Sequence, residues 1–172
     1  MNHQSALDPI LVIAFFKPKV YFWGKKELFK GRLFSWFLRK IGVISIDRNG
    51  QDLLAVKSAL KLLKEEKKFV VFPEGTRNTD DTQRMLKLKQ GVAMLAIKAK
   101  SPIRLAYMFR KPKAFRRNYI MVSDEFSMEE FYGEKLTGEV LDKAMEIIEH
   151  QYTQLQEKLT ETLVLKGKTV KM

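Results

Sequence analysis

Short apolar runs alternate with helical periodicity along this chain, and that alternation constrains its fold more than any other feature. The runs at 43–46 and 68–72 are mostly apolar, and the segment between them, 51–66, repeats apolar residues at helical spacing. Strands that are apolar on both sides are typical of a sheet that helices cover on both faces. The pattern therefore predicts an α/β fold with a mostly parallel central sheet flanked by helices.

The remaining elements extend the same pattern over 172 residues, which are enough for one compact core. We expect one domain over 1–172, with an acidic helical C-terminal part at about 126–166. The expected helices are 10–16, 31–41, 51–66, 89–100 and 137–165, the last one broken or frayed near its end. The expected strands are 20–23, 43–46, 68–72, 102–108 and 118–123, and 25–29 is expected to form a helical turn.

The net charge of the chain is strongly positive, and its charged residues are unevenly distributed. Lys and Arg number 32 against 20 Asp and Glu, and the stretch 84–117 holds 11 basic residues and no acidic one. Such a surface attracts anionic partners, among them nucleic acid, anionic lipid, phosphorylated metabolites and acidic carrier proteins. The chain contains no cysteine, which excludes disulfides and thiolate nucleophiles. No apolar stretch reaches the roughly 20 residues needed to span a bilayer, so we expect any membrane contact to be peripheral.

The first segment with candidate chemistry is 2–8, which contains His3 and Asp8. On one straight helix these two side chains would point about 140° apart, because each residue turns the helix by about 100°. They can meet if a turn separates them, with Asp8 at the N-cap of the helix that follows. A carboxylate on one imidazole nitrogen would leave the other nitrogen free to deprotonate a hydroxyl. The alternative is a surface histidine beside an N-cap aspartate.

A second segment, 69–78, is an apolar strand that ends in a polar turn, the position at which open α/β sheets bind ligands. Gly75 lets backbone approach an anion closely, Thr76 adds a hydroxyl donor, and Arg77 offers a planar fork that matches phosphate. Glu74 belongs to the same candidate phosphate site, although its carboxylate would repel phosphate and more plausibly anchors a neighbouring Arg or Lys. The alternative is an ordinary charged turn.

Two further basic residues complete this candidate phosphate site. Arg48 follows the apolar strand 43–46, and two strands ending at the same edge of a sheet could bring Arg48 and Arg77 to one phosphate. Lys89, just before Gly91, adds positive charge. The ligand cluster that a metal site needs is absent from the sequence, so no metal is expected.

Together these segments resemble the glycerolipid acyltransferase family, and most closely its 1-acylglycerol-3-phosphate acyltransferases. The resemblance covers about 2–125. Its first two parts are Asn2, His3, Ser5 and Asp8, and then Gly42 to Arg48. The third part, Phe72 to Arg77, matches Phe-Pro-Glu-Gly-Thr-Arg completely and is followed by Lys89 to Gly91. The fourth part is Pro102 with Ile103, where Leu105 replaces a second proline. Family members usually carry an N-terminal membrane-associating segment, and we expect none in this chain.

The resemblance implies an acyltransferase that needs no cofactor, with acyl-CoA or acyl-carrier protein as co-substrate. His3 and Asp8 would be the catalytic pair, and Arg48, Glu74, Gly75, Thr76, Arg77 and Lys89 would form the acceptor phosphate site. The implied reaction acylates the sn-2 hydroxyl of 1-acylglycerol 3-phosphate to give phosphatidic acid in phospholipid synthesis. Ser5 is expected to support the turn. The implied location is the cytoplasmic face of an anionic membrane, as a peripheral protein.

Three alternatives remain at this point. The acceptor could be another lysophospholipid or glycerol 3-phosphate. The chain could be a non-catalytic lipid-binding domain, or a basic nucleic-acid-binding domain, although it shows no nucleic-acid motif and no nucleic acid is expected. Segment 31–41 is relevant to membrane contact, because Trp36 lies beside the broad apolar face of the expected helix, between Arg32 and Arg39. Trp36 either faces a lipid headgroup layer or packs against a neighbouring element.

Overall fold

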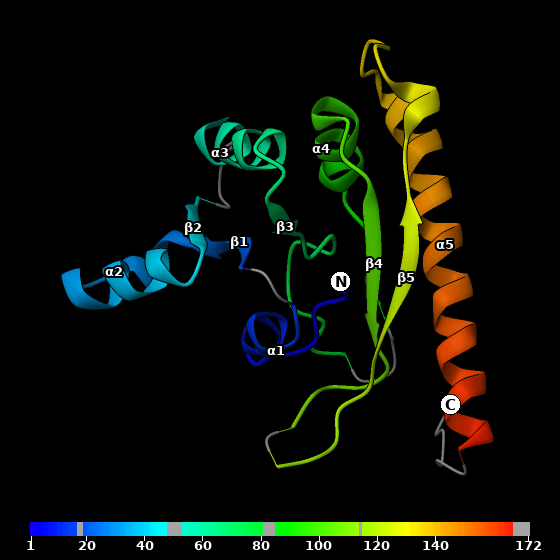
Figure 1. Ribbon diagram of the computed structural model, residues 1–172, viewed down its shortest axis with the longest axis horizontal. Helices are drawn as coiled ribbons and strands as arrows, with labels where there is room; N and C mark the ends of the chain where they lie inside the picture. Colours follow the sequence, from blue (N-terminus) through cyan, green and yellow to red (C-terminus); the bar gives the residue numbers. More distant parts are fainter. Residues whose placement is uncertain (17–18, 48–52, 81–84, 114, 167–172) are drawn as a thin grey trace. The chain divides into compact units, whose positions relative to one another are not determined.

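The computed structural model describes residues 1–16, 19–47, 53–80, 85–113 and 115–166 (Figure 1). These residues fall into two compact units. Unit 1 comprises Met1–Leu7 and Phe72–Met172, and unit 2 comprises Asp8–Val71. The prediction of one domain over 1–172 stays a prediction, and each unit is described by itself.

Unit 2 is built on a parallel three-stranded sheet with the strand order β2-β1-β3. The central strand pairs with both neighbours, so that Phe22 lies opposite Val43 on one side and Val70 on the other. The strands are β1 (Val20–Lys25), β2 (Val43–Ile46) and β3 (Lys68–Val70), and the helices are α1 (Asp8–Phe15), the 3₁₀ turn η1 (Lys26–Phe29), α2 (Arg32–Lys40) and α3 (Leu53–Lys64).

The core of unit 2 is small. Its buried cluster consists of Phe22, Leu38 and Val43, with partly buried apolar residues around it. Gly42 permits the tight entry into β2, since its φ is +96° and a Cβ there would lie 2.4 Å from the carbonyl oxygen of Val20. On α3, Ala55 is buried and its carbonyl accepts a hydrogen bond from the indole N–H of Trp23 at 3.3 Å.

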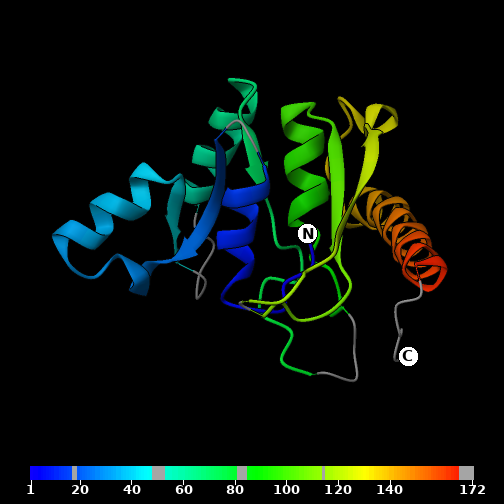
Figure 2. The same ribbon diagram turned by 60° about the horizontal axis from the view of Figure 1, so that its bottom comes forward.

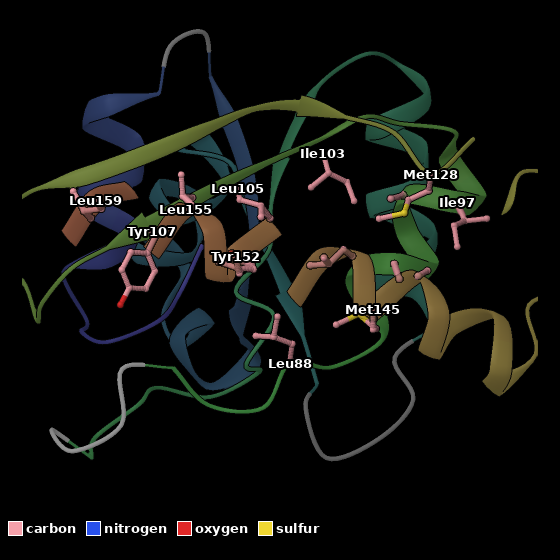
Figure 3. Close-up of a cluster of buried hydrophobic side chains, with 14 of the residues drawn as sticks. Leu88, Ile97, Ile103, Leu105, Tyr107, Met128, Met145, Tyr152, Leu155 and Leu159 are labelled. Atoms are coloured by element: carbon pink, nitrogen blue, oxygen red, sulfur yellow. The ribbon is translucent and has the colours of Figure 1, made fainter. Parts of the chain in front are cut away.

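Unit 1 combines an antiparallel strand pair with two helices (Figure 1). A continuous apolar core joins residues of both helices to residues of the first strand, and it includes Tyr107 and Tyr152 (Figure 3). Ile148 belongs to the same core. Ala144 and Ile148 of the last helix are fully buried in this core, and their spacing of four residues places them on one face of the helix. The elements are α4 (Gly91–Ala99), β4 (Ile103–Met108), β5 (Ile120–Phe126), the 3₁₀ turn η2 (Glu129–Phe131) and α5 (Gly138–Leu165).

The structure confirms the predicted α/β class, and parallel pairing predominates because both strand pairs of unit 2 are parallel. The last helix differs from its prediction, because α5 continues without a break to Leu165. Its buried residues recur at helical spacing along the whole length, so packing stabilises the C-terminal turns that propensity alone leaves uncertain. Thr137 caps its start by accepting a hydrogen bond from the N–H of Val140.

Candidate functional site

The N-terminal segment of unit 1 is tied to strand β4. The side-chain amide of Asn2 donates to the carbonyl of Met108 at 2.9 Å, and its oxygen accepts from the N–H of Met108 at 2.8 Å. Asn2 is completely buried. This paired contact imitates a strand ladder, and it holds the residue before His3 in a defined position (Figure 2 shows the N-terminus beside β4).

His3 is held on three sides by the segment that follows β3. Its N–H donates to Oε1 of Glu74 at 2.5 Å, and its carbonyl accepts from the N–H of Asn78 at 2.7 Å. Its ring lies against the ring of Phe72, with centroids 4.4 Å apart. The side chain is only 8% exposed. The backbone of His3 is therefore fixed, and its imidazole packs against an aromatic ring. A group that must act in one orientation needs such support.

Glu74 connects three segments of unit 1 through its carboxylate. Besides the N–H of His3, it accepts the N–H of Leu86 at 2.8 Å. The residue is 2% exposed, and this burial raises the pKa of its carboxyl, while the two backbone donors from Leu86 and His3 act in the opposite direction. The sequence suggested a neighbouring Arg or Lys as the group that Glu74 anchors. The carboxylate instead binds backbone amides, so it organises the loop that carries His3.

Gly75 and Lys89 lie against each other. Gly75 has a φ of +70°, and a Cβ there would lie 2.7 Å from Cε and 2.8 Å from Nζ of Lys89. The N–H of Lys89 also donates to the carbonyl of Pro73 at 2.8 Å. Glycine is needed on both counts, because it adopts the left-handed conformation and leaves room for the lysine stem. The ammonium group of Lys89 thus lies beside the turn.

Thr76 and Arg77 are exposed on the same turn, directly before the Asn78 that binds the backbone of His3. Unit 1 therefore brings six of the predicted residues into one region. A base, a backbone turn and two cations within one region can bind an anionic group beside a hydroxyl that the base deprotonates. These six residues are His3, Glu74, Gly75, Thr76, Arg77 and Lys89.

The other two predicted site residues are Asp8 and Arg48. Asp8 is the first residue of α1 and is completely buried in unit 2, so its pairing with His3 stays a prediction. A turn precedes it at residues 6–7, and the hydroxyl of Ser5 accepts from the N–H of Leu7 at 3.2 Å, which fits the supporting role expected of Ser5. Arg48 lies outside the described residues.

Sequence reasoning missed two residues near this site. Asn78 is 5% exposed, and its side-chain oxygen accepts from the N–H of Asp80 at 3.0 Å. Tyr152 on α5 is 1% exposed, and its hydroxyl has no hydrogen-bond partner within the described ranges. Burial, followed by the charge of Glu74, raises the pKa of Tyr152. The Asx turn at Asn78 had a local signal, an asparagine just after a charged turn, whereas nothing local distinguishes Tyr152 from other core residues.

Similarity to known proteins agrees with this geometry. The family model described as Acyltransferase matches residues 1–107, and the chain therefore belongs to this family. The 1-acyl-sn-glycerol-3-phosphate acyltransferase of Streptococcus pneumoniae is 35% identical over 100 residues, which are 57% of this chain and 36% of that protein. The enzyme of the same name from Bacillus subtilis is 32% identical over 103 residues, 59% of this chain and 50% of that protein.

The fold is also similar to a solved structure. The crystal structure of the 1-acyl-sn-glycerophosphate acyltransferase PlsC from Thermotoga maritima matches with a TM-score of 0.66 and 23% identity, over 99% of this chain and 66% of that one. The predicted glycerolipid acyltransferase-like fold is thereby confirmed. The matched regions span only about a third to a half of these two curated relatives.

Proposed function

We propose that this chain transfers a fatty acyl group from acyl-CoA or acyl-carrier protein to the sn-2 hydroxyl of 1-acylglycerol 3-phosphate, giving phosphatidic acid. The observation that carries the proposal is the pair of hydrogen bonds that holds the backbone of His3. Glu74 and Asn78 fix the backbone of His3 against the turn that presents Arg77. Support also comes from the family match and from the printed names of the bacterial relatives.

The chemistry proceeds by direct transfer. The imidazole of His3 removes the proton from the acceptor hydroxyl, whose oxygen attacks the thioester carbonyl. The tetrahedral intermediate collapses with cleavage of the C–S bond, and the thiolate leaves and takes up a proton. Asp8 orients His3 and favours the imidazolium that forms during the transfer. Alignment of the hydroxyl with the thioester is the main contribution, since holding two reactants in place can supply about 7–11 kcal/mol.

The acceptor phosphate binds at the turn after β3. Arg77 provides a planar fork, Lys89 provides a point charge beside Gly75, and Thr76 adds a hydroxyl. Arg48 is proposed as a further ligand of this phosphate. Both Arg77 and Lys89 are exposed, so a phosphate can reach them from solvent.

The test is release of free CoA from acyl-CoA, measured with 1-acylglycerol 3-phosphate as acceptor. Arg77→Ala should raise the KM for this acceptor about 10- to 100-fold, because a hydrogen bond to a charged group contributes roughly 1.5–3 kcal/mol. The KM for acyl-CoA should change little.

Arg104→Ala is the matched control, because Arg104 is an exposed arginine of unit 1 that pairs with Glu125 on β5 at 3.3 Å. It should leave both KM values unchanged. An unaltered acceptor KM in Arg77→Ala would remove Arg77 from the phosphate site. Faster CoA release with glycerol 3-phosphate, or with a lysophospholipid lacking a terminal phosphate, would reassign the acceptor.

A further inference from the structure

Helix α2 in unit 2 leaves most of its large apolar side chains in solvent. Leu33 is 80% exposed, Trp36 58%, Phe34 51% and Phe37 48%. Leu28 on the neighbouring turn η1 is 49% exposed. Only Leu38 of this helix is buried, in the small core with Phe22 and Val43. The apolar face of α2 is therefore wider than the part that the core of unit 2 covers.

Basic residues accompany these apolar side chains along η1 and α2. Between Lys25 and Lys40 the chain has six basic residues and a single acidic one, Glu27. All six basic residues are exposed. They are Lys25, Lys26, Lys30, Arg32, Arg39 and Lys40. The exposed surface of η1 and α2, which we call the α2 surface, thus combines apolar bulk with a high density of positive charge.

Basic and apolar side chains of α2 lie on different sides of the helix: Arg32, Arg39 and Lys40 share one side, and the apolar residues Leu33, Phe34 and Phe37 share the other. At about 100° per residue, Trp36 falls between Arg32 and Lys40. The ammonium group of Lys40 lies 4.8 Å from the centre of the Trp36 ring. The rings of Phe34 and Phe37 stack with centroids 6.4 Å apart. A helix with one basic side, one broad apolar side and a tryptophan among its basic residues can lie where an apolar layer meets anionic headgroups.

We propose that the α2 surface docks unit 2 onto an anionic lipid bilayer. In this orientation α2 lies in the plane of the interface, with Leu33, Phe34 and Phe37 among the upper acyl chains. Trp36 lies at the level of the headgroups, and the basic side chains extend to the phosphates. Within the described ranges, no helix combines the length and apolarity needed to cross a membrane.

A bilayer fits this surface better than an acidic protein does. Protein interfaces gather apolar residues in a central patch and place charges at a polar rim. On α2 the basic residues Arg32, Arg39 and Lys40 instead form one side of the helix, and the exposed apolar residues form the adjoining side. A helix that lies in the headgroup layer meets phosphates on its basic side and acyl chains on its apolar side at any point of the bilayer, so no matching pattern of acidic side chains is required.

The experiment is flotation of the full chain with vesicles, in the absence of any acyl donor or acceptor. One set of vesicles is phosphatidylcholine alone, and the other contains about a third phosphatidylglycerol, which supplies the anionic charge. The wild type should float with the anionic vesicles and much less with the neutral ones. Its binding should weaken as salt is raised, because salt screens exposed charges.

Variants locate the binding surface. Trp36→Ser with Phe37→Ser should lower partitioning onto anionic vesicles by about tenfold or more, since two large apolar side chains no longer leave water. Arg32→Glu with Arg39→Glu should lower it by a similar factor. The matched control is Leu53→Ser with Leu54→Ser, which removes two exposed apolar side chains, 64% and 76% exposed, from α3 of the same unit. This control should bind within about twofold of the wild type.

Three results would overturn the proposal. They are equal flotation of the wild type and the Trp36→Ser/Phe37→Ser variant, an equal loss in the α3 control, and capture of an acidic acyl-carrier protein through the same residues without any binding to vesicles. All substituted side chains are exposed, and thermal melting of each variant checks that it remains folded. Because no acyl transfer is measured, the outcome is independent of the proposed reaction.

Discussion

The two units differ in how completely they bury their apolar side chains. In unit 1 a continuous core runs through α4, β4 and α5, and it includes residues such as Ile148 with no exposed surface. In unit 2 the buried cluster consists of Phe22, Leu38 and Val43. Nine of the thirteen large apolar side chains found exposed in the described ranges belong to unit 2, although it is the shorter unit.

This difference fits the two tasks proposed for the units. A base and a phosphate site need side chains held in place, and a large core beneath them supplies that rigidity. A surface that meets a bilayer must instead keep apolar side chains available until it binds. The contrast between unit 1, which carries His3, and the α2 surface can be tested by substitutions that act on one and leave the other unchanged.

The largest effect is expected for His3→Ala. Turnover should fall by about 10²- to 10⁴-fold, because a general base contributes that factor. Flotation with anionic vesicles should be unchanged, since the α2 surface belongs to unit 2. His150→Ala is the control, because His150 is the second histidine of the chain and is exposed on α5. Turnover in His3→Ala above about a tenth of the wild-type rate would contradict the role of a general base.

The next largest effect is a difference in the free energy of unfolding between a substitution in unit 1 and one in unit 2. Ile148→Ala should lower the free energy of unfolding by about 2–5 kcal/mol, because it opens a cavity in the core of unit 1. Leu33→Ala on α2 removes a side chain of similar size that is 80% exposed, and it should change stability by less than about 0.5 kcal/mol. Urea unfolding measures both. Similar losses in the two variants would mean that α2 is packed in solution.

A smaller effect is expected at the loop that carries His3. Glu74→Gln should lower the free energy of unfolding by about 1–3 kcal/mol, since at least one backbone donor, of His3 or Leu86, then faces an amide group. Turnover should fall more than acceptor binding, because the variant disturbs the position of the base. The charge variant Glu65→Gln, at an exposed carboxylate, should leave both unchanged.

The same variant tests the pH dependence of stability. Burial raises the pKa of Glu74, so the folded chain holds this proton more tightly than the unfolded chain does. The resulting stabilisation is complete below the unfolded pKa of about 4.3 and is lost as the pH rises through the folded pKa. Stability of the wild type relative to Glu74→Gln should therefore decrease as the pH is raised from about 4. A constant difference between the two would show that the pKa is not raised.

The smallest effect is expected for Tyr152→Phe. The Tyr152 hydroxyl is buried and has no hydrogen-bond partner within the described ranges, so removing it should leave stability unchanged or raise it by up to about 1 kcal/mol. A loss above about 1 kcal/mol would show that the hydroxyl is hydrogen-bonded in solution. The measurement therefore decides whether the buried hydroxyl of Tyr152 is hydrogen-bonded.

Most elements of both units could be predicted from local patterns. The strand at 43–46 and the helical turn near 25–29 follow from apolar periodicity, and the structure places β2 and η1 there. The turn from Glu74 to Arg77 was also evident, because a polar segment directly follows a strand. Local patterns failed where tertiary packing decides the structure. They did not predict that α5 is continuous. They also left two alternatives for Trp36, exposure or burial against a neighbour, and the side chain is exposed.

The sequence by itself determined which residues could do the chemistry, because a histidine, an arginine and a glycine have the same functional groups wherever they lie. Only the tertiary structure decided how they are held. Glu74 meets the N–H of His3 across 71 positions, and Asn2 meets Met108 across 106. Likewise, the sequence made α2 amphipathic, but only packing showed that Leu38 alone is buried. Contacts between distant segments depend on the whole fold, which no local pattern encodes.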